Sequence, residues 1–157
     1  MINDQTFMQM AIDRARAGMK DGQSPFGACI VRDGAVICCE HNIVWRDTDA
    51  TAHAEVTAIR IACKKVGAIR LEGATIYSTT EPCPMCFASI HWARCSRIYY
   101  GTNIADVAAL GFNEMEISNF QMRDIGKSPV EVFPDFMREE CLELLHFWQN
   151  LTTRQTY

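Results

Sequence analysis

Two short segments, well separated in the chain, carry side chains that can share one metal ion. The first is His53-Ala54-Glu55 and the second is Pro82-Cys83-Pro84-Met85-Cys86. Zinc in a catalytic site usually takes three protein ligands and leaves the fourth tetrahedral position to water. His53, Cys83 and Cys86 supply one imidazole and two thiolates. We therefore expect a fold that brings the two segments together around one Zn²⁺ per chain, with a bound water or hydroxide.

Glu55 is a carboxylate that these three ligands leave free. A carboxylate beside a metal-bound water can take a proton from it and deliver that proton to a substrate. Glu55 is therefore the predicted catalytic acid and base, and the pattern indicates hydrolysis more than metal storage. A zinc-stabilised binding module is the non-enzyme alternative, because it would keep the three ligands without needing Glu55.

The length and composition predict one domain. With 157 residues, 48% of them hydrophobic, the chain is long enough for one well-buried core and too short for two. We expect a single domain over residues 1–157. No apolar run approaches the roughly 18 residues that a membrane span needs, and no signal peptide is visible at the start. These features predict a cytoplasmic protein with no membrane partner.

The charge argues against a nucleic-acid partner. Binding to a phosphate backbone relies on a basic patch, whereas this chain has a net charge of −4 and no such patch is visible. The remaining cysteines lie in apolar helix or strand patterns, which is typical of reduced, buried thiols. This expectation covers Cys29, Cys38, Cys39, Cys63, Cys95 and Cys141.

The order of predicted elements indicates an α/β fold. Asp33-Gly34 is a two-residue hairpin signal, so the first two strands should be antiparallel. The expected strands cover 26–32, 35–42, 74–78, 97–101 and 130–133. Helices are expected near 4–19, 51–67, 84–93, 104–110 and 137–151, with a polar loop over 46–50. A five-stranded mixed sheet with helices on both faces, in three α/β/α layers, fits this order.

Both predicted ligand segments lie at helix starts. Gly67 can end the helix that begins near Thr51, so His53 and Glu55 would lie in its first turn, and Pro84 is tolerated early in the next helix. Helix N-termini carry unpaired N–H groups and partial positive charge, which stabilise thiolates and developing oxyanions. Two such ends close to zinc would favour ionisation of its water.

The H-x-E and P-C-x-x-C pair is the known signature of zinc nucleobase deaminases. The resemblance extends to Pro25-Phe26-Gly27-Ala28, to the run from Thr51 to Arg60 and to Trp92-Ala93-Arg94. The chain resembles the cytidine-deaminase-like superfamily, in its guanine deaminase branch, from the first helix to about Gly111 and again at Tyr157. This resemblance implies the same five-stranded fold, a homodimer, and hydrolytic deamination of a base.

The resemblance also implies the residues that hold the base. It places Phe26, Asn42 and Trp92 in the base pocket, where aromatic faces suit a flat base and an amide can read a base edge. It likewise places Ala54 and Tyr157 against the base, with residues 152–157 forming a C-terminal tail that closes the active site. Without the resemblance, an aromatic residue in an apolar segment is more often part of the core.

The segment Gly111-Phe112-Asn113-Glu114 bears on the choice of substrate. Similar guanine deaminases have Gly-Phe-Asp-Asp, whose last acid shuttles a second proton, so Glu114 is the matching catalytic acid here. Guanine is therefore the expected substrate, with xanthine and ammonia as products. The longer Glu114 side chain leaves another aminopurine, a triazine or a pyrimidine base as alternatives. A tRNA adenosine deaminase is a further alternative, although such enzymes usually have Pro-Val-Gly-Ala and basic C-terminal helices.

Overall fold

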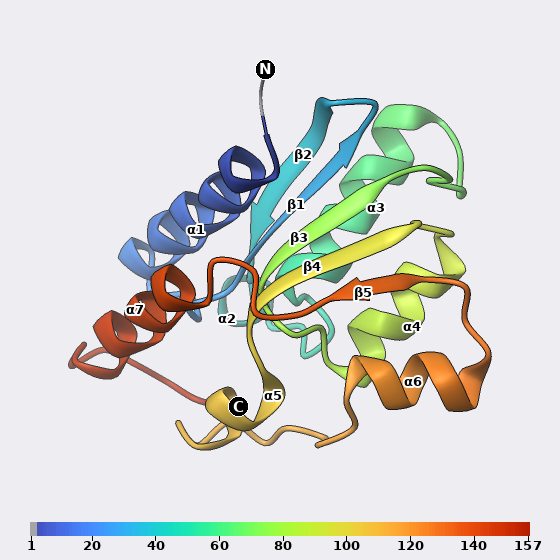
Figure 1. Ribbon diagram of the computed structural model, residues 1–157. Coiled ribbons are helices and arrows are strands. Elements are labelled where there is room, and N and C mark those ends of the chain that lie inside the picture. The colour runs from blue at the N-terminus through green and yellow to red at the C-terminus, as the bar shows by residue number, and fades with distance from the viewer. Residues whose placement is uncertain (1–2) are drawn as a thin grey trace.

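A five-stranded mixed sheet forms the centre of the computed structural model, which describes residues 3–157 (Figure 1). The strands lie in the order β2-β1-β3-β4-β5. Their bounds are Gly27–Arg32 for β1, Ala35–His41 for β2, Thr75–Thr80 for β3, Arg97–Thr102 for β4 and Glu131–Phe133 for β5. The mixed sheet expected from the sequence is confirmed.

The strand directions follow from the connections between strands. β1 and β2 are antiparallel, and the turn residues Asp33 and Gly34 have φ angles of 52° and 73°, as a type I′ hairpin requires. β3 is antiparallel to β1, whereas β3, β4 and β5 are parallel. Parallel neighbours need a crossover connection, and the helices after β3 and β4 supply it.

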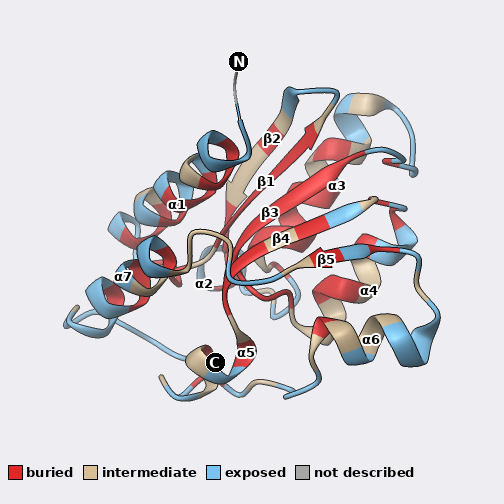
Figure 2. Cartoon of the chain, in the orientation of Figure 1, coloured by how far each residue is buried: buried red, intermediate tan, exposed pale blue. Residues whose placement is uncertain are grey.

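Helices cover both faces of the sheet (Figure 1). α1 (Asp4–Lys20) and α7 (Arg138–Gln149) pack together on one face. α3 (Ala54–Val66) and α4 (Pro84–Trp92) lie on the other. One apolar core lies on each side of the sheet, so β1 and β3 are almost entirely buried (Figure 2). The predicted three-layer α/β/α architecture is confirmed.

Three short helices differ from the sequence expectation. α5 (Ile104–Ala108) is slightly shorter than predicted, and α2 (Val44–Asp47) overlaps the expected loop. α6 (Asn119–Gly126) was not predicted from the sequence, and it is only eight residues long. A capping box stabilises its start: the Ser118 hydroxyl accepts the Gln121 N–H, and the Gln121 side chain accepts the Ser118 N–H.

The expectation of reduced thiols is wrong for two cysteines, because Cys29 and Cys39 form a disulfide. The two residues lie directly opposite each other in the β1–β2 register, with Cα atoms 4.1 Å apart. The sequence pattern placed each residue in a strand, but the facing register becomes visible only in the paired sheet. The other four predicted thiols are free, and all but the half-buried Cys63 are buried: Cys38, Cys63, Cys95 and Cys141.

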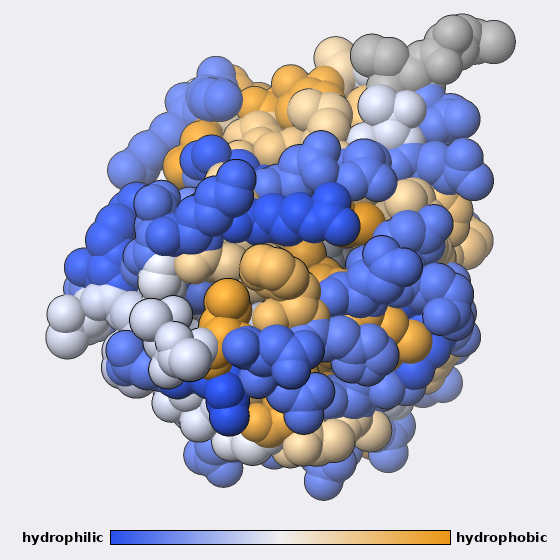
Figure 3. Space-filling view, turned by 90° about the vertical axis from the view of Figure 1, so that its left-hand side faces the viewer, coloured by the Kyte–Doolittle hydropathy of each residue, from blue (hydrophilic) through white to orange (hydrophobic). Residues whose placement is uncertain are grey.

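The surface over α1 and α7 is largely hydrophilic, with smaller hydrophobic areas between the polar residues (Figure 3). Both helices keep their apolar residues against the sheet and their charged residues outside, as amphipathic surface helices do. Within residues 3–157, no helix combines the length and the apolar content that are needed to cross a membrane.

Candidate active site

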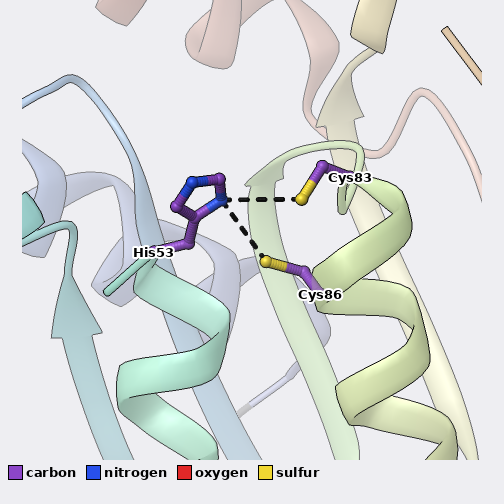
Figure 4. Close-up of side chains that lie close together, drawn as sticks. All are labelled: His53, Cys83 and Cys86. Atoms are coloured by element: carbon purple, nitrogen blue, oxygen red, sulfur yellow. Dashed lines mark hydrogen bonds between the residues drawn. The ribbon is translucent and has the colours of Figure 1, made fainter. Parts of the chain in front are cut away.

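Two helix N-termini lie side by side and present the three predicted ligands to a common space (Figure 4). His53 is the N-cap residue of α3 and not part of its first turn, because its ψ of 160° is extended and the helix begins at Ala54, later than the expected start near Thr51. Cys83 is the N-cap residue of α4, and Cys86 lies in the first turn of that helix. His53 therefore belongs to the start of α3, and Cys83 and Cys86 belong to the start of α4.

The distances between the ligand atoms fit a zinc ion. The three atoms lie within 4.8 Å of one another, and His53 Nδ1 is 3.5 Å from each of the two sulfur atoms. Tetrahedral zinc, with bonds of about 2.0–2.1 Å to nitrogen and about 2.3 Å to sulfur, places such ligands about 3.5 Å apart. No further His, Cys, Asp or Glu of the described residues joins the group. The fourth position is thus left for water or substrate.

The local electrostatics favour a thiolate at this place. Hydrogen bonding to Cys86, together with the hydrogen bond and positive charge of His53, lowers the pKa of Cys83 to about 4 despite its burial. Burial would lower the pKa of His53, but the hydrogen bond to Cys83 and its negative charge raise it overall. Burial raises the pKa of Cys86 well above its ordinary value. Metal binding would therefore release the Cys86 proton.

Glu55 lies in the first turn of α3, buried beside the ligand group. Its Oε1 accepts a hydrogen bond of 2.7 Å from Ser78 Oγ, and its Oε2 is 3.4 Å from Cys86 Sγ. Burial raises the pKa of Glu55, although the positive charge of His53 opposes this effect. Ser78 was not predicted from the sequence, because it is one of several hydroxyl side chains in the run Thr75–Thr80 and nothing local distinguishes it from the others.

The end of the chain covers the ligand group. Tyr157 packs against His53, Phe112 and Trp45, with ring centroids 5.6, 5.3 and 6.1 Å away. Its hydroxyl is 2.6 Å from Nδ2 of the fully buried Asn42, and its carbonyl accepts the Asn113 N–H at 2.9 Å. Tyr157 of the same chain thus lies beside the ligand group, and closure of the site by residues 152–157 stays a prediction.

Two more of the nominated residues face this space. Phe26 and Glu114 line a small cavity together with His53, Glu55 and Tyr157. Burial, followed by the negative charge of Cys83, raises the pKa of Glu114 to about 7. The cavity volume of about 20 Å³ has room for a water molecule. A larger pocket of about 330 Å³ adjoins it and shares the lining residues His53, Glu114 and Tyr157.

Glu81 and Asn119 were missed from the sequence, and they fix the surroundings of Cys83. The two oxygens of the buried Glu81 accept the N–H of Asn119 at 2.8 Å and the N–H of Ile104 at 3.0 Å. Asn119 Nδ2 donates to the Pro82 carbonyl at 2.6 Å. The starts of α5 and α6 are therefore tied to the segment that carries Cys83.

The structure does not place Trp92 in this pocket, contrary to expectation. Its side chain is 80% exposed and lies at the last position of α4, far along the helix from Cys83. The buried face of α4 contains Cys86 and Ile90, and Trp92 is about 200° around the helix from Ile90. Ala54, at the first position of α3, is fully buried and does not line the cavity.

Comparison with known proteins adds a family match and two kinds of relative. The family model for the cytidine and deoxycytidylate deaminase zinc-binding region matches residues 1–102. A guanine deaminase from Bacillus subtilis (strain 168) is 39% identical over 160 residues, covering 99% of this chain and 100% of the relative. A tRNA-specific adenosine deaminase from the same strain is 33% identical over 141 residues, covering 90% of this chain and 85% of the relative.

A solved structure agrees with the observed fold. The X-ray structure of guanine deaminase from Bacillus subtilis superposes on this chain with a TM-score of 0.70 at 37% sequence identity. The superposition covers 99% of each chain. The similarity therefore includes α7 and the tail, beyond the part that the family model matches.

Proposed function

The chain belongs to the cytidine and deoxycytidylate deaminase family, and from that membership we propose that it deaminates a free nucleobase, with guanine as the substrate. Membership makes the protein a zinc-dependent hydrolytic deaminase. The substrate is the part that we propose. The full-length similarity to a guanine deaminase and the acid at position 114 support guanine, and the tail supports a free base.

The single observation that carries the proposal is the position of Tyr157. Its ring lies beside His53, and its hydroxyl contacts Asn42, so Tyr157 forms one wall of a pocket of about 330 Å³ that Cys83 and Glu114 also line. A pocket of that size suits a small ligand such as a free base. A nucleotide that is flipped out of an RNA remains bonded to the chain on both sides and needs a wider path. The position of Tyr157 therefore favours a free base over a tRNA.

The ligand set supports one zinc ion per chain, held by His53, Cys83 and Cys86. The nitrogen–sulfur distances of 3.5 Å and the depressed pKa of Cys83 both suit a cation there. When bound, zinc lowers the pKa of a water molecule from 15.7 toward about 7 and so makes it nucleophilic near neutral pH.

The reaction converts guanine and water to xanthine and ammonia. A C–O bond forms at the ring carbon that carries the amino group, and the C–N bond to that group breaks. Glu55 would take a proton from the water and pass it to the neighbouring ring nitrogen. Glu114, with a pKa of about 7, would carry the second proton from the added hydroxyl to the departing amine. Asn42 and Phe26 would hold the base.

An ammonia-release screen of zinc-loaded protein tests the proposal. The substrates are guanine, guanosine, adenine, cytosine, cytidine, isocytosine and a tRNA anticodon stem-loop. We expect turnover of guanine and less turnover of guanosine, because a ribose would have to lie against Tyr157, which forms one wall of the pocket. Inert guanine combined with turnover of another member would overturn the guanine assignment. The Glu55→Gln variant should keep its zinc and lose about 10²- to 10⁴-fold in turnover.

We also propose that the protein forms a homodimer through α3 and α4. Trp92 and Ile69 are each 80% exposed and line one surface groove with Val56 and Ile59. Exposed aromatic and aliphatic side chains of this kind are enriched in subunit interfaces. Light scattering should give a dimer for the wild type and a monomer for Trp92→Asp. A wild-type monomer would contradict the proposal.

A further inference from the structure

Ser78 places a hydroxyl group where the fold otherwise requires an apolar side chain. Side chains along β3 alternate, so Ile76 and Ser78 face α3 and α4 while Tyr77 faces α1 and α7. Ser78 is 1% exposed, and Ile76 on the same face is fully buried. Burying a hydroxyl is unfavourable unless it forms hydrogen bonds, so the contacts of this group indicate its purpose.

The Ser78 hydroxyl lies between two acceptors. Its Oγ is 2.7 Å from Glu55 Oε1 and 2.6 Å from the main-chain carbonyl of Thr80. A serine hydroxyl has one proton to donate and two lone pairs that accept. It can donate to an ionised Glu55, or accept a proton from a neutral Glu55 while it donates to the Thr80 carbonyl. Both arrangements keep Ser78 hydrogen-bonded to Glu55, whereas the Thr80 carbonyl alone would satisfy a structural serine.

The contact with Ser78 also determines how the Glu55 carboxylate is turned. Rotation about the last bond of a glutamate side chain is nearly unhindered, so an unheld carboxylate adopts many orientations. Ser78 holds Oε1, and Oε2 then lies 3.4 Å from Cys86 Sγ, on the side of the ligand group. One carboxylate oxygen, Oε1, is thus held by β3, and the other, Oε2, faces the ligand group.

We propose that Ser78 is a positioning residue that orients the carboxylate of Glu55 for proton transfer. This role rests on the proposed function, because only in hydrolytic deamination does Glu55 transfer a proton. A hydrogen bond to a charged group is worth on the order of 10- to 100-fold in rate when it acts on the transition state. Loss of the hydroxyl should therefore lower kcat by that factor, whereas KM changes little because Ser78 does not line the cavity.

The variants Ser78→Thr and Ser78→Val test the role because their side chains have nearly the same shape and differ in one hydroxyl. Both suit a β-strand, so any cost of the added methyl group is shared. Thr57→Val is the matched control. Thr57 is buried on α3, two residues after Glu55, and among the described residues its hydroxyl has no hydrogen-bond partner. Zinc content and melting temperature are measured for all variants.

We expect Ser78→Val to lose 10- to 100-fold in kcat, with zinc content and KM unchanged, while Ser78→Thr and Thr57→Val stay within about threefold of wild type. Equal losses in Ser78→Val and Ser78→Thr would overturn the inference, because shape would then be the cause. Unchanged kcat in Ser78→Val would overturn it as well.

A readout without turnover separates this inference from the proposed function. The infrared carboxyl band of Glu55, identified by its absence in Glu55→Gln, should shift in Ser78→Val and remain in place in Ser78→Thr. An unshifted band in Ser78→Val would overturn the inference whatever the substrate is. Failure of wild-type protein to deaminate guanine would overturn only the guanine assignment, and kcat would then be measured with the base that is turned over.

Discussion

Removal of the Asn119 side chain tests whether the metal-ligand segment is held from the side of α6. Asn119 is fully buried, and its Nδ2 donates a hydrogen bond of 2.6 Å to the Pro82 carbonyl. Pro82 immediately precedes Cys83. The variant Asn119→Ala leaves that carbonyl without this donor in a place that water does not reach.

The expected cost follows from the carbonyl that is left unpaired. Removing one partner of a hydrogen bond, so that the other stays buried and unsatisfied, costs about 1–3 kcal/mol in the free energy of unfolding. For a chain of this length, 1 kcal/mol corresponds to roughly 2–4 °C in melting temperature. We therefore expect Asn119→Ala to melt about 2–12 °C below wild type and to bind zinc more weakly.

Asn150 provides the control, because it makes the same kind of bond at the surface. Its Nδ2 donates to the His146 carbonyl at 2.9 Å, and its residue is exposed. In Asn150→Ala, water replaces the amide, so the melting temperature should change by about 1 °C or less. Calorimetry and a competitive zinc titration give the two readouts. Equal melting temperatures for the two variants would refute the reasoning, because burial would then make no difference.

Three further variants test the fold and the site. Gly27→Ala would place its Cβ on a main-chain carbonyl of α1 and should melt about 2–12 °C lower, whereas Gly126→Ala, which meets open space, should not. The hydrogen bond from Arg138 lowers the pKa of Asp106. The pair therefore stabilises the fold above the ordinary Asp pKa, and this stabilisation is lost in acid as Asp106 takes up a proton. Asp106→Asn should lower the melting temperature at pH 7 and match wild type near pH 2. Glu114→Gln removes the acid that carries the second proton and should cost on the order of a hundredfold or more in ammonia release; an unchanged rate would argue against its role.

The sequence predicted the elements of the fold well because their signals are local. The hairpin at Asp33-Gly34, the C-cap at Gly67 and the early Pro84 each act within a few residues. The helix α6 was missed although its capping box, Ser118 and Gln121, is a local signal. The facing register of Cys29 and Cys39 was missed because it depends on pairing between strands.

Within the site, predictability followed the chemistry of each residue type. Ligand residues such as His53 and Cys83 are rare and carry recognisable spacings, so they were nominated from the sequence, and the structure places them together. Ser78 and Asn119 are common residues whose importance comes from contacts across the fold. Trp92 was nominated by resemblance alone, and the direction in which it leaves α4 became visible only in three dimensions.

The site lies beyond the carboxyl ends of the parallel strands β3 and β4. Open α/β sheets bind ligands beyond the carboxyl ends of their strands, because connections from neighbouring strands diverge there. Here Glu81, just after β3, accepts an N–H from the start of α5 and another from the start of α6. The segment that carries Glu114 runs between those two helices, so one buried carboxylate fixes both of its ends. The tail then anchors to the same segment through the Asn113 N–H. Movement of the tail can therefore occur without displacing the predicted zinc ligands, because His53, Cys83 and Cys86 belong to the starts of α3 and α4.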